Sequence, residues 1–126
     1  MKYSYQAKEN KSAKAAGVAL RISPRNSVDV CREINGLPLA KGKRLLENLL
    51  LEKVSIGRKY YTNTAEEILN LLKSAEANAE FKGLDAERLF ISAVVGKGFT
   101  FMRPRRMKLR GMKRKVANLQ IVLEER

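Results

Sequence analysis

The sequence contains no histidine and a single cysteine, and these two scarcities exclude much of enzyme chemistry. Histidine is the most common general base and metal ligand near neutral pH, so its absence removes the usual means of both functions. One cysteine forms neither an internal disulfide nor a cysteine-rich zinc site. Cys31 lies among apolar neighbours, and we interpret it as a small core residue in a reducing compartment.

Motifs for phosphate binding and membrane insertion are also lacking. No G-x-x-x-x-G-K-[ST] motif occurs, and Gly96-Lys97-Gly98 is a G-x-G fragment that follows an expected strand without opening a helix. We interpret Glu66-Glu67 and Glu124-Glu125 as surface charges. No run of about 18 apolar residues and no secretory signal is present, so we expect a cytoplasmic protein without a membrane span. We also expect no enzyme activity, no metal and no cofactor.

Positive charge is what the sequence does contain, and it is unevenly distributed. The formal net charge is +13, and residues 97–115 (KGFTFMRPRRMKLRGMKRK) supply nine Lys or Arg with no acidic residue. Residues 1–28 carry a net charge of +5, whereas residues 29–96 hold ten charges of each sign. Positive charge of this local density predicts a polyanionic partner.

Hydrophobic periodicity predicts three strands and three helices. Alternation indicates strands at 17–22, with Val18, Leu20 and Ile22 inward, and at 89–95 and 119–123. Helices are expected from Ser23-Pro24 to Asn35-Gly36, from Pro38 to Lys53, and from a Thr64–Glu67 capping box to Gly83. The residues expected to face the core in these helices are Val28, Cys31 and Ile34, then Leu39, Leu45, Leu46, Leu49 and Leu50, then Ala65, Ile68, Leu69, Leu72, Ala75 and Ala79.

The basic stretch is predicted to be a protruding β-hairpin. If the second and third strands pair antiparallel, the 35 residues from Leu89 to Leu123 turn near 105–111. Each arm then has roughly 15 residues, or about 50 Å, whereas a typical body strand needs about 5–6 residues. Gly96 and Gly98 would allow a bulge where the arm leaves the body, and Pro104 suits an exposed edge or the start of the turn.

These elements predict one domain over residues 1–126. We expect a basic N-terminal arm at 1–16, a globular body at 17–96 and 116–125, and an extended hairpin at 97–115. A disordered basic tail is the alternative for the last segment, but tails usually lie at a chain end, and here a strand follows.

Arginine and lysine point to phosphate binding, because both side chains hydrogen-bond phosphate oxygens. Phe99 and Phe101 share a strand face and either stack on bases or pack over the edge of the body, which we favour. The candidate RNA-binding residues form an N-terminal patch of Lys8, Lys11, Lys14, Arg21 and Arg25 and a second group of Lys97, Arg103, Arg105, Arg106, Lys108, Arg110, Lys113, Arg114 and Lys115.

Four blocks of the sequence resemble a known family. Residues 21–25 read RISPR at the start of a helix, and residues 72–80 read LKSAEANAE before Gly83-Leu84-Asp85. Residues 90–92 read FIS, and Arg103-Pro104-Arg105 precedes the basic hairpin. In this order the blocks resemble large-subunit ribosomal protein family L-twenty-two, in an archaeal or eukaryotic-like form. The resemblance covers about Lys11 to Glu125.

The resemblance implies a three-stranded antiparallel sheet packed against three helices, with a long protruding basic β-hairpin. It implies a structural constituent of the large ribosomal subunit that binds ribosomal RNA and aids its assembly. Its partners would be neighbouring large-subunit proteins and the nascent peptide, and it would be monomeric within the particle. The hairpin tip would line the peptide exit tunnel with Met107, Lys108, Leu109, Arg110 and Gly111. Residues 105–111 depart from the family's usual tip, and Asn118 stands where histidine is usual.

Two other functions are compatible with a basic hairpin. A DNA-bending architectural protein would insert such an arm into a minor groove. Those proteins are usually dimers, however, and this chain shows no large second apolar face. An RNA enzyme or chaperone outside the ribosome is the weakest alternative, since histidine and metal ligands are lacking.

Overall fold

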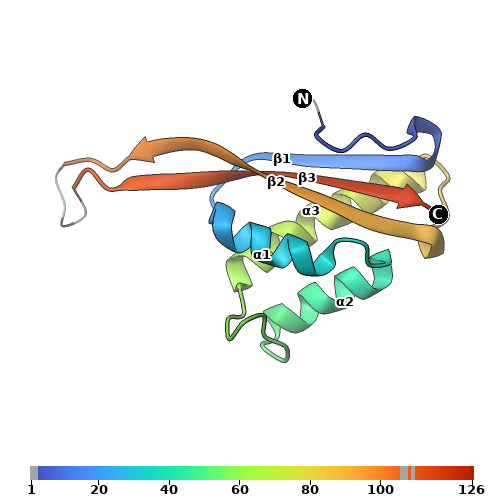
Figure 1. Cartoon of the computed structure of the whole chain (residues 1–126), viewed down its shortest axis with the longest axis horizontal. Helices are drawn as coiled ribbons and strands as arrows, with labels where there is room; N and C mark the ends of the chain where they lie inside the picture. Colours follow the sequence, from blue (N-terminus) through green and yellow to red (C-terminus); the bar gives the residue numbers. More distant parts are fainter. Residues whose placement is uncertain (1–2, 106–107, 109) are drawn as a thin grey trace.

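A three-stranded antiparallel sheet forms one layer of the molecule, and three helices cover one of its faces (Figure 1). The computed structural model describes residues 3–105, 108 and 110–126. The strands, in the sheet order β1-β3-β2, are β1 (Ser12–Leu20), β2 (Leu89–Met102) and β3 (Lys113–Glu125). The helices are α1 (Pro24–Ile34), α2 (Leu39–Leu50) and α3 (Thr62–Phe81), with short 3-10 turns η1 (Glu9–Lys11) and η2 (Ala86–Arg88). The predicted α+β class, with three antiparallel strands and three helices, is confirmed.

The core lies between β3, the central strand, and the helices. α3 packs against β1 and β3, α1 packs against β2, and α2 packs mainly on α3. The predicted stripe on α3 is confirmed, because all six of its residues are buried: Ala65, Ile68, Leu69, Leu72, Ala75 and Ala79. The predicted alternation in β3 is also confirmed, since Leu119, Ile121 and Leu123 are buried in the same cluster.

Helix α1 begins where the sequence predicts. The Ser23 hydroxyl accepts a hydrogen bond from the backbone N–H of Asn26 at 3.5 Å, and Pro24 is the first helical residue. Cys31 is buried, and burial raises the pKa of its thiol to about 12, which fits the predicted core role. Val28 is exposed, so its predicted inward position is wrong; the buried stripe passes through Val30 instead.

The start of α3 differs from the prediction. The helix begins at Thr62, and its N-cap, Tyr61, has a left-handed backbone with φ 48° and makes no side-chain cap hydrogen bond. Thr64 lies inside the first turn and is buried. The predicted Thr64–Glu67 capping box is therefore wrong. The Tyr61 hydroxyl instead donates to Asp29 of α1 at 3.1 Å, which joins the two helices.

Strand β1 starts earlier than its hydrophobic pattern indicates. It begins at Ser12, so residues 12–16 of the expected N-terminal arm belong to the sheet. Ser12, Ala13 and Ala15 are buried, and α3 packs against this strand with its own small residues Ala75 and Ala79 in the same layer of the core. Small residues on both elements allow a close approach, but they give a weak hydrophobic signal.

A bulge interrupts the alternation at the end of β1. The pairing with β3 shifts register between Gly17 and Leu20, and Ala19 there has a left-handed backbone with φ 56°. The Ala19 N–H donates to Oδ1 of Asn118 at 2.9 Å, which satisfies the displaced backbone group. Val18 is consequently 62% exposed, and the predicted inward face that includes it is wrong.

The outer edge of β2 is covered by the chain that links α1 to α2. The Gly36 N–H donates to the Ile91 carbonyl at 2.9 Å, and the Ile91 N–H donates to the Leu37 carbonyl at 3.0 Å. The Asn35 side chain completes the cover, since its amide donates to the Ala93 carbonyl at 3.1 Å and its oxygen accepts from the Ala93 N–H at 2.6 Å. Within the body this edge therefore has its backbone groups paired.

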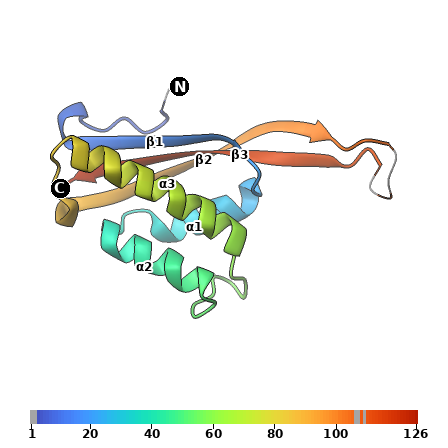
Figure 2. The same cartoon turned by 180° about the vertical axis from the view of Figure 1, so that it is seen from behind.

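The outer edge of β1 is covered by side chains from α3. Nζ of Lys82 donates to the Ser12 carbonyl, and Nδ2 of Asn78 donates to the Lys14 carbonyl, each at 2.9 Å. These bonds fix the end of α3 against the start of β1, as seen from behind in Figure 2.

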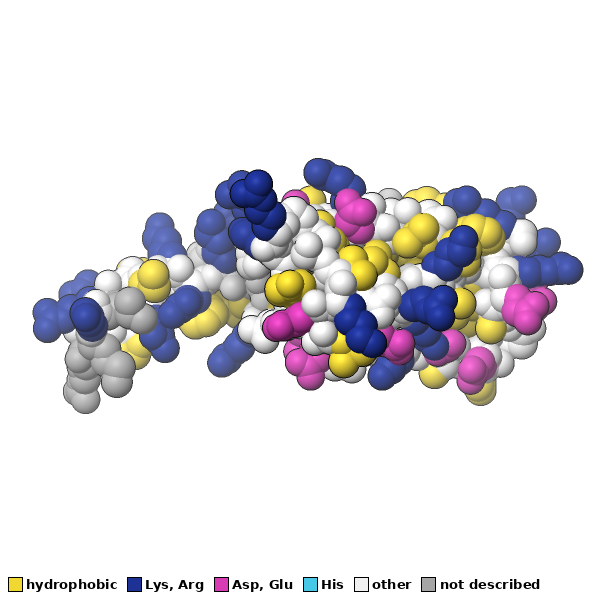
Figure 3. All heavy atoms as spheres, turned by 90° about the horizontal axis from the view of Figure 1, so that it is seen from below, with side chains coloured by type: hydrophobic (Ala, Val, Ile, Leu, Met, Phe, Trp, Pro, Cys, Tyr) yellow, Lys and Arg dark blue, Asp and Glu magenta, His cyan; other side chains and the backbone are white. Residues whose placement is uncertain are grey.

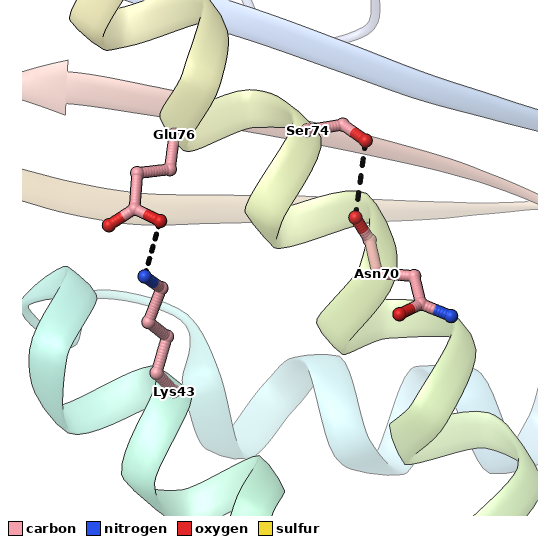
Figure 4. Close-up of polar contacts among 4 residues, drawn as sticks. All are labelled: Lys43, Asn70, Ser74 and Glu76. Carbon is pink, nitrogen blue, oxygen red and sulfur yellow. Dashed lines mark hydrogen bonds and ion pairs between the residues drawn. The ribbon is translucent and has the colours of Figure 1, made fainter.

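Polar contacts also order the helical layer. Figure 4 shows the side chains of Lys43 on α2 and Glu76 on α3 pointing toward one another in an ion pair. On α3 the Ser74 hydroxyl donates to the Asn70 carbonyl one turn earlier, at 3.2 Å.

The helix-free face of the sheet carries the N-terminal segment (Figure 1). The Ser4 N–H donates to Oε1 of Gln120 at 2.9 Å, and the Tyr5 hydroxyl donates to Oε2 of Glu124 at 2.8 Å. Nζ of Lys14 lies 5.5 Å from the centroid of the Tyr3 ring. The described part of the expected arm thus lies on the sheet.

Strands β2 and β3 continue past the end of β1 as a two-stranded ribbon that projects beyond the helices (Figure 1). We call residues 98–103 and 112–116 the basic ribbon. Its last pair in the sheet is Met102 with Lys113, and the Arg103 N–H then donates to the Met112 carbonyl at 3.1 Å. Pro104 follows immediately, as predicted for a residue that starts the turn. The turn itself includes residues outside the described part of the chain.

A second bulge lies at the base of the basic ribbon. Between the pairs Lys97–Ala117 and Thr100–Lys115, β2 has two residues where β3 has one, Val116. A Cβ on Gly98 would lie 2.5 Å from Cγ2 of Val116 and 3.0 Å from its carbonyl oxygen. Glycine at this position therefore lets the two strands approach closely at the point where the ribbon leaves the body.

Substitution of this glycine tests the close approach. We expect Gly98→Ala to destabilise the protein by about 1–3 kcal/mol, because Val116 is buried and both its Cγ2 and its backbone carbonyl would have to shift. Gly96→Ala is the matched control, since a Cβ there meets its nearest atoms at 3.8 Å. Urea unfolding measures both, and equal midpoints for the two variants would contradict this role of Gly98.

Candidate nucleic-acid interface

A basic groove forms where the start of α1 meets the basic ribbon. It holds five Lys or Arg side chains, and no described residue that lines it is acidic. The lining residues are Arg21, Ile22, Ser23, Pro24, Phe101, Arg103, Lys113, Arg114 and Lys115. The bulge in β1 and the turn that follows it bring Arg21 to the ribbon, about ninety residues away in sequence.

No ion pair among the described residues neutralises the charges of the groove. The ion pairs that the described residues form, Lys43–Glu76 and Asp85–Arg88, lie in the body, and none involves a described cation of residues 97–115. On the face that Figure 3 displays, Lys and Arg side chains follow the ribbon while the acidic side chains lie over the body. The N-terminus of α1 adds positive potential from its backbone dipole. The groove is therefore suited to an anion that supplies several negative charges.

Apolar side chains lie between these cations. Phe99 is 63% exposed and Phe101 is 36% exposed, and their ring centroids are 6.4 Å apart. Met102 and Met112 are also exposed on the ribbon. The favoured interpretation, in which the phenyl rings pack over the edge of the body, is wrong for Phe99, whereas Phe101 lines the groove beside Ile22 and Pro24 of the body. Exposed rings beside arginine and lysine are available for stacking on bases or sugars.

The predicted residues of the basic stretch fall into three groups. Arg103, Lys113, Arg114 and Lys115 line the groove. Lys97 is exposed where the ribbon leaves the body. Beyond the last strand pair, Arg105, Lys108 and Arg110 are exposed, and Gly111 has a left-handed backbone with φ 62°. Arg106, Met107 and Leu109 lie outside the described residues.

The predicted N-terminal patch is not one site. Arg21 lines the groove, and Arg25 follows it on the first turn of α1. Lys8, Lys11 and Lys14 lie toward the opposite end of β1, about 20–30 Å away at the usual rise of a strand. Sequence proximity alone grouped these five residues, whereas the strand between them separates them.

The described residues offer neither a metal cluster nor a membrane-spanning helix. Among them, no group of three or more Cys, Asp or Glu is placed to hold a metal ion. No helix within the described part of the chain is long and apolar enough to cross a membrane.

The fold and the groove define an α+β protein that presents a basic two-stranded ribbon. The family model described as "Ribosomal protein L22p/L17e" matches residues 15–123. A protein from Methanococcoides burtonii named "Large ribosomal subunit protein uL22" is 33% identical over 99% of this chain and 97% of its own length. Similarly named proteins from Methanococcus vannielii and Methanosphaera stadtmanae are 32% and 38% identical over 98% and 69% of this chain and 95% and 70% of their own lengths. The chain belongs to the ribosomal protein L22p/L17e family, which confirms the resemblance seen in the sequence.

Uncompensated charge in the groove predicts a salt effect on stability. Sodium chloride should stabilise the isolated protein, because it screens repulsion among the five cations. We expect Lys113→Gln, Arg114→Gln and Lys115→Gln together to raise the free energy of unfolding at low salt by on the order of 1 kcal/mol and to reduce its salt dependence.

The matched control replaces three exposed lysines of the charge-balanced body, Lys41, Lys53 and Lys73, by glutamine. Thermal unfolding across a salt series compares the two triple variants. An identical salt response of both would mean that the groove cations do not repel one another appreciably.

Proposed function

We propose that this chain is a structural component of the large ribosomal subunit that binds ribosomal RNA through its basic groove and ribbon. Its family membership supports a ribosomal role. The observation that carries RNA binding is the groove itself, with five cations, an exposed phenyl ring and no acidic residue among the described residues that line it. Phosphates would pair with the cations, and unpaired bases or sugars would contact the rings.

The ribbon needs such a partner for physical reasons. Past the start of α1 the described ribbon projects beyond the helices and has no third strand, and an isolated two-stranded ribbon is marginal in water. In the body, by contrast, backbone groups on the outer edges of β1 and β2 bond to α3, its C-cap and the link between α1 and α2. RNA would neutralise the repulsion and fix the ribbon, so binding and ordering are coupled. This coupling is how the protein would aid subunit assembly.

We extend the proposal to the end of the ribbon. In this account the residues of the turn reach the wall of the peptide exit tunnel, where Lys108, Arg110 and Gly111, together with Met107 and Leu109, face or border the nascent peptide. Lys108 and Arg110 are exposed and lie beyond the last strand pair, as a tip that contacts a separate partner requires.

The remaining parts of the proposal follow from a structural role. The protein would act without enzyme activity or cofactor, as a single copy in each cytoplasmic ribosome, beside neighbouring large-subunit proteins. Lys97, Arg105 and Arg106, which lie outside the basic ribbon as defined, would add further phosphate contacts.

Incorporation into subunits tests the groove. The triple variant Lys113→Gln, Arg114→Gln and Lys115→Gln should remain in large subunits about tenfold less than wild type at roughly 0.5 M salt, because each lost phosphate contact weakens RNA binding. The triple variant of Lys41, Lys53 and Lys73 should incorporate normally. Tagged copies expressed beside the wild type and counted by mass spectrometry give the ratio. Equal retention of the two variants would argue against the groove as the anchor.

Changes at the tip should act differently. Lys108→Ala with Arg110→Ala should leave incorporation nearly unchanged but alter the response of translation to a tunnel-binding antibiotic or to a nascent peptide rich in acidic residues. The reason is that these side chains would contact the peptide path and not the anchoring RNA. Translation assays with purified variant ribosomes measure this effect, and wild-type behaviour in both assays would refute tunnel lining.

A further inference from the structure

The side chain of Phe81 is almost fully exposed, at the end of the body farthest from the ribbon. Phe81 is the last residue of α3 and is 94% exposed. In Figure 1 this end of α3 lies beside the start of β1 and η1, and Figure 2 shows the same arrangement from behind. Burying an exposed phenyl ring is favourable, so a partner that covers Phe81 would gain free energy of binding from it.

The surroundings of Phe81 are basic. One hollow is lined by Glu9, Lys14, Asn78, Phe81 and Lys82, and a second, which shares Glu9, is lined by Lys8, Asn10 and Lys11. Four lysines thus accompany one carboxylate. Charge of this sign favours an anion over an apolar protein surface.

Two of these lysines are held in position by the fold. Nζ of Lys82 donates one hydrogen bond to the Ser12 carbonyl at 2.9 Å, which leaves two of its three N–H donors for a ligand. The backbone carbonyl of Lys14, on β1, accepts a hydrogen bond from the Asn78 side chain. The Lys14 ammonium lies over the Tyr3 ring. Lys82 also offsets the partial negative charge at the C-terminus of α3, which would otherwise repel a phosphate.

We propose that this surface binds an unpaired nucleotide of RNA, with the base stacked on Phe81 and the flanking phosphates beside Lys14, Lys82 and the lysines of the adjoining hollow. The base must be unpaired, since the face of a paired base is covered by its neighbours in the helix. This inference rests on the proposed function and gives it a second, separate contact. The two RNA-binding surfaces lie at opposite ends of β1, so the body would bridge RNA segments about 30 Å apart.

The absence of tryptophan from the chain provides a direct test. In the full-length variant Phe81→Trp, the indole is the one tryptophan fluorophore and reports stacking by quenching. We expect saturable quenching by a single-stranded RNA of about ten nucleotides, and little quenching by duplex RNA of equal length. Lys8→Gln with Lys11→Gln in this background should raise the RNA concentration at half-quenching several-fold. Leu51→Trp, on the loop after α2 and 63% exposed in the native protein, is the matched control and should not be quenched.

The outcomes separate this inference from the proposed function. If the Phe81→Trp variant binds RNA in a salt-sensitive manner by filter retention but its indole is not quenched, the Phe81 surface is overturned and the groove stays intact. Equal quenching by single-stranded and duplex RNA would also overturn the surface, because stacking needs an unpaired base. No RNA binding in either assay would overturn the proposed function itself. In otherwise native protein, Phe81→Ala should weaken retention of the single-stranded RNA about tenfold and Phe81→Tyr should not.

Discussion

The structure depends on how the central strand β3 is paired. Over Leu119 to Glu124 it has β1 on one side and β2 on the other, and its inward side chains reach the helices. From Lys115 back to Lys113, its N-terminal end, β3 pairs with β2 alone. The same strand therefore serves first as the middle of a core and then as half of an exposed ribbon. The two bulges lie on either side of this change, opposite Asn118 and Val116.

The charge distribution follows the same division. The body balances its charges and covers both sheet edges, by the link between α1 and α2 on one side and by α3 on the other. The ribbon has cations without acidic partners and open edges. Such a segment adds little to the stability of the isolated protein, because a two-stranded ribbon with exposed edges is marginal in water. We therefore propose that the body anchors the ribbon and that the ribbon binds a polyanion, which in a ribosomal protein family would be ribosomal RNA.

Much of this fold could be predicted from the sequence because its large apolar residues are regularly spaced. Ile68, Leu69 and Leu72 predict the stripe on α3 in this way, whereas the cap at Ser23 is predicted by a serine that precedes a proline. The start of β1 was missed because Ala13 and Ala15 bury little area and carry a weak periodic signal. The groove was missed because Arg21 joins the ribbon through strand pairing, which local patterns do not encode. The exposure of Phe81 could not be predicted, because a phenylalanine at the end of a helix is usually expected to be buried.

The central claim is that the protein is an integral part of the large subunit, held by many phosphate contacts. Fractionation of a cell lysate on a sucrose gradient in high-salt buffer, with the protein quantified by mass spectrometry, tests it most directly, since salt removes proteins held by a few loose contacts. We expect the protein to stay with the large subunit at about one copy per particle. Recovery at the top of the gradient, or with DNA, would contradict it and favour an architectural protein that bends DNA with its basic arm.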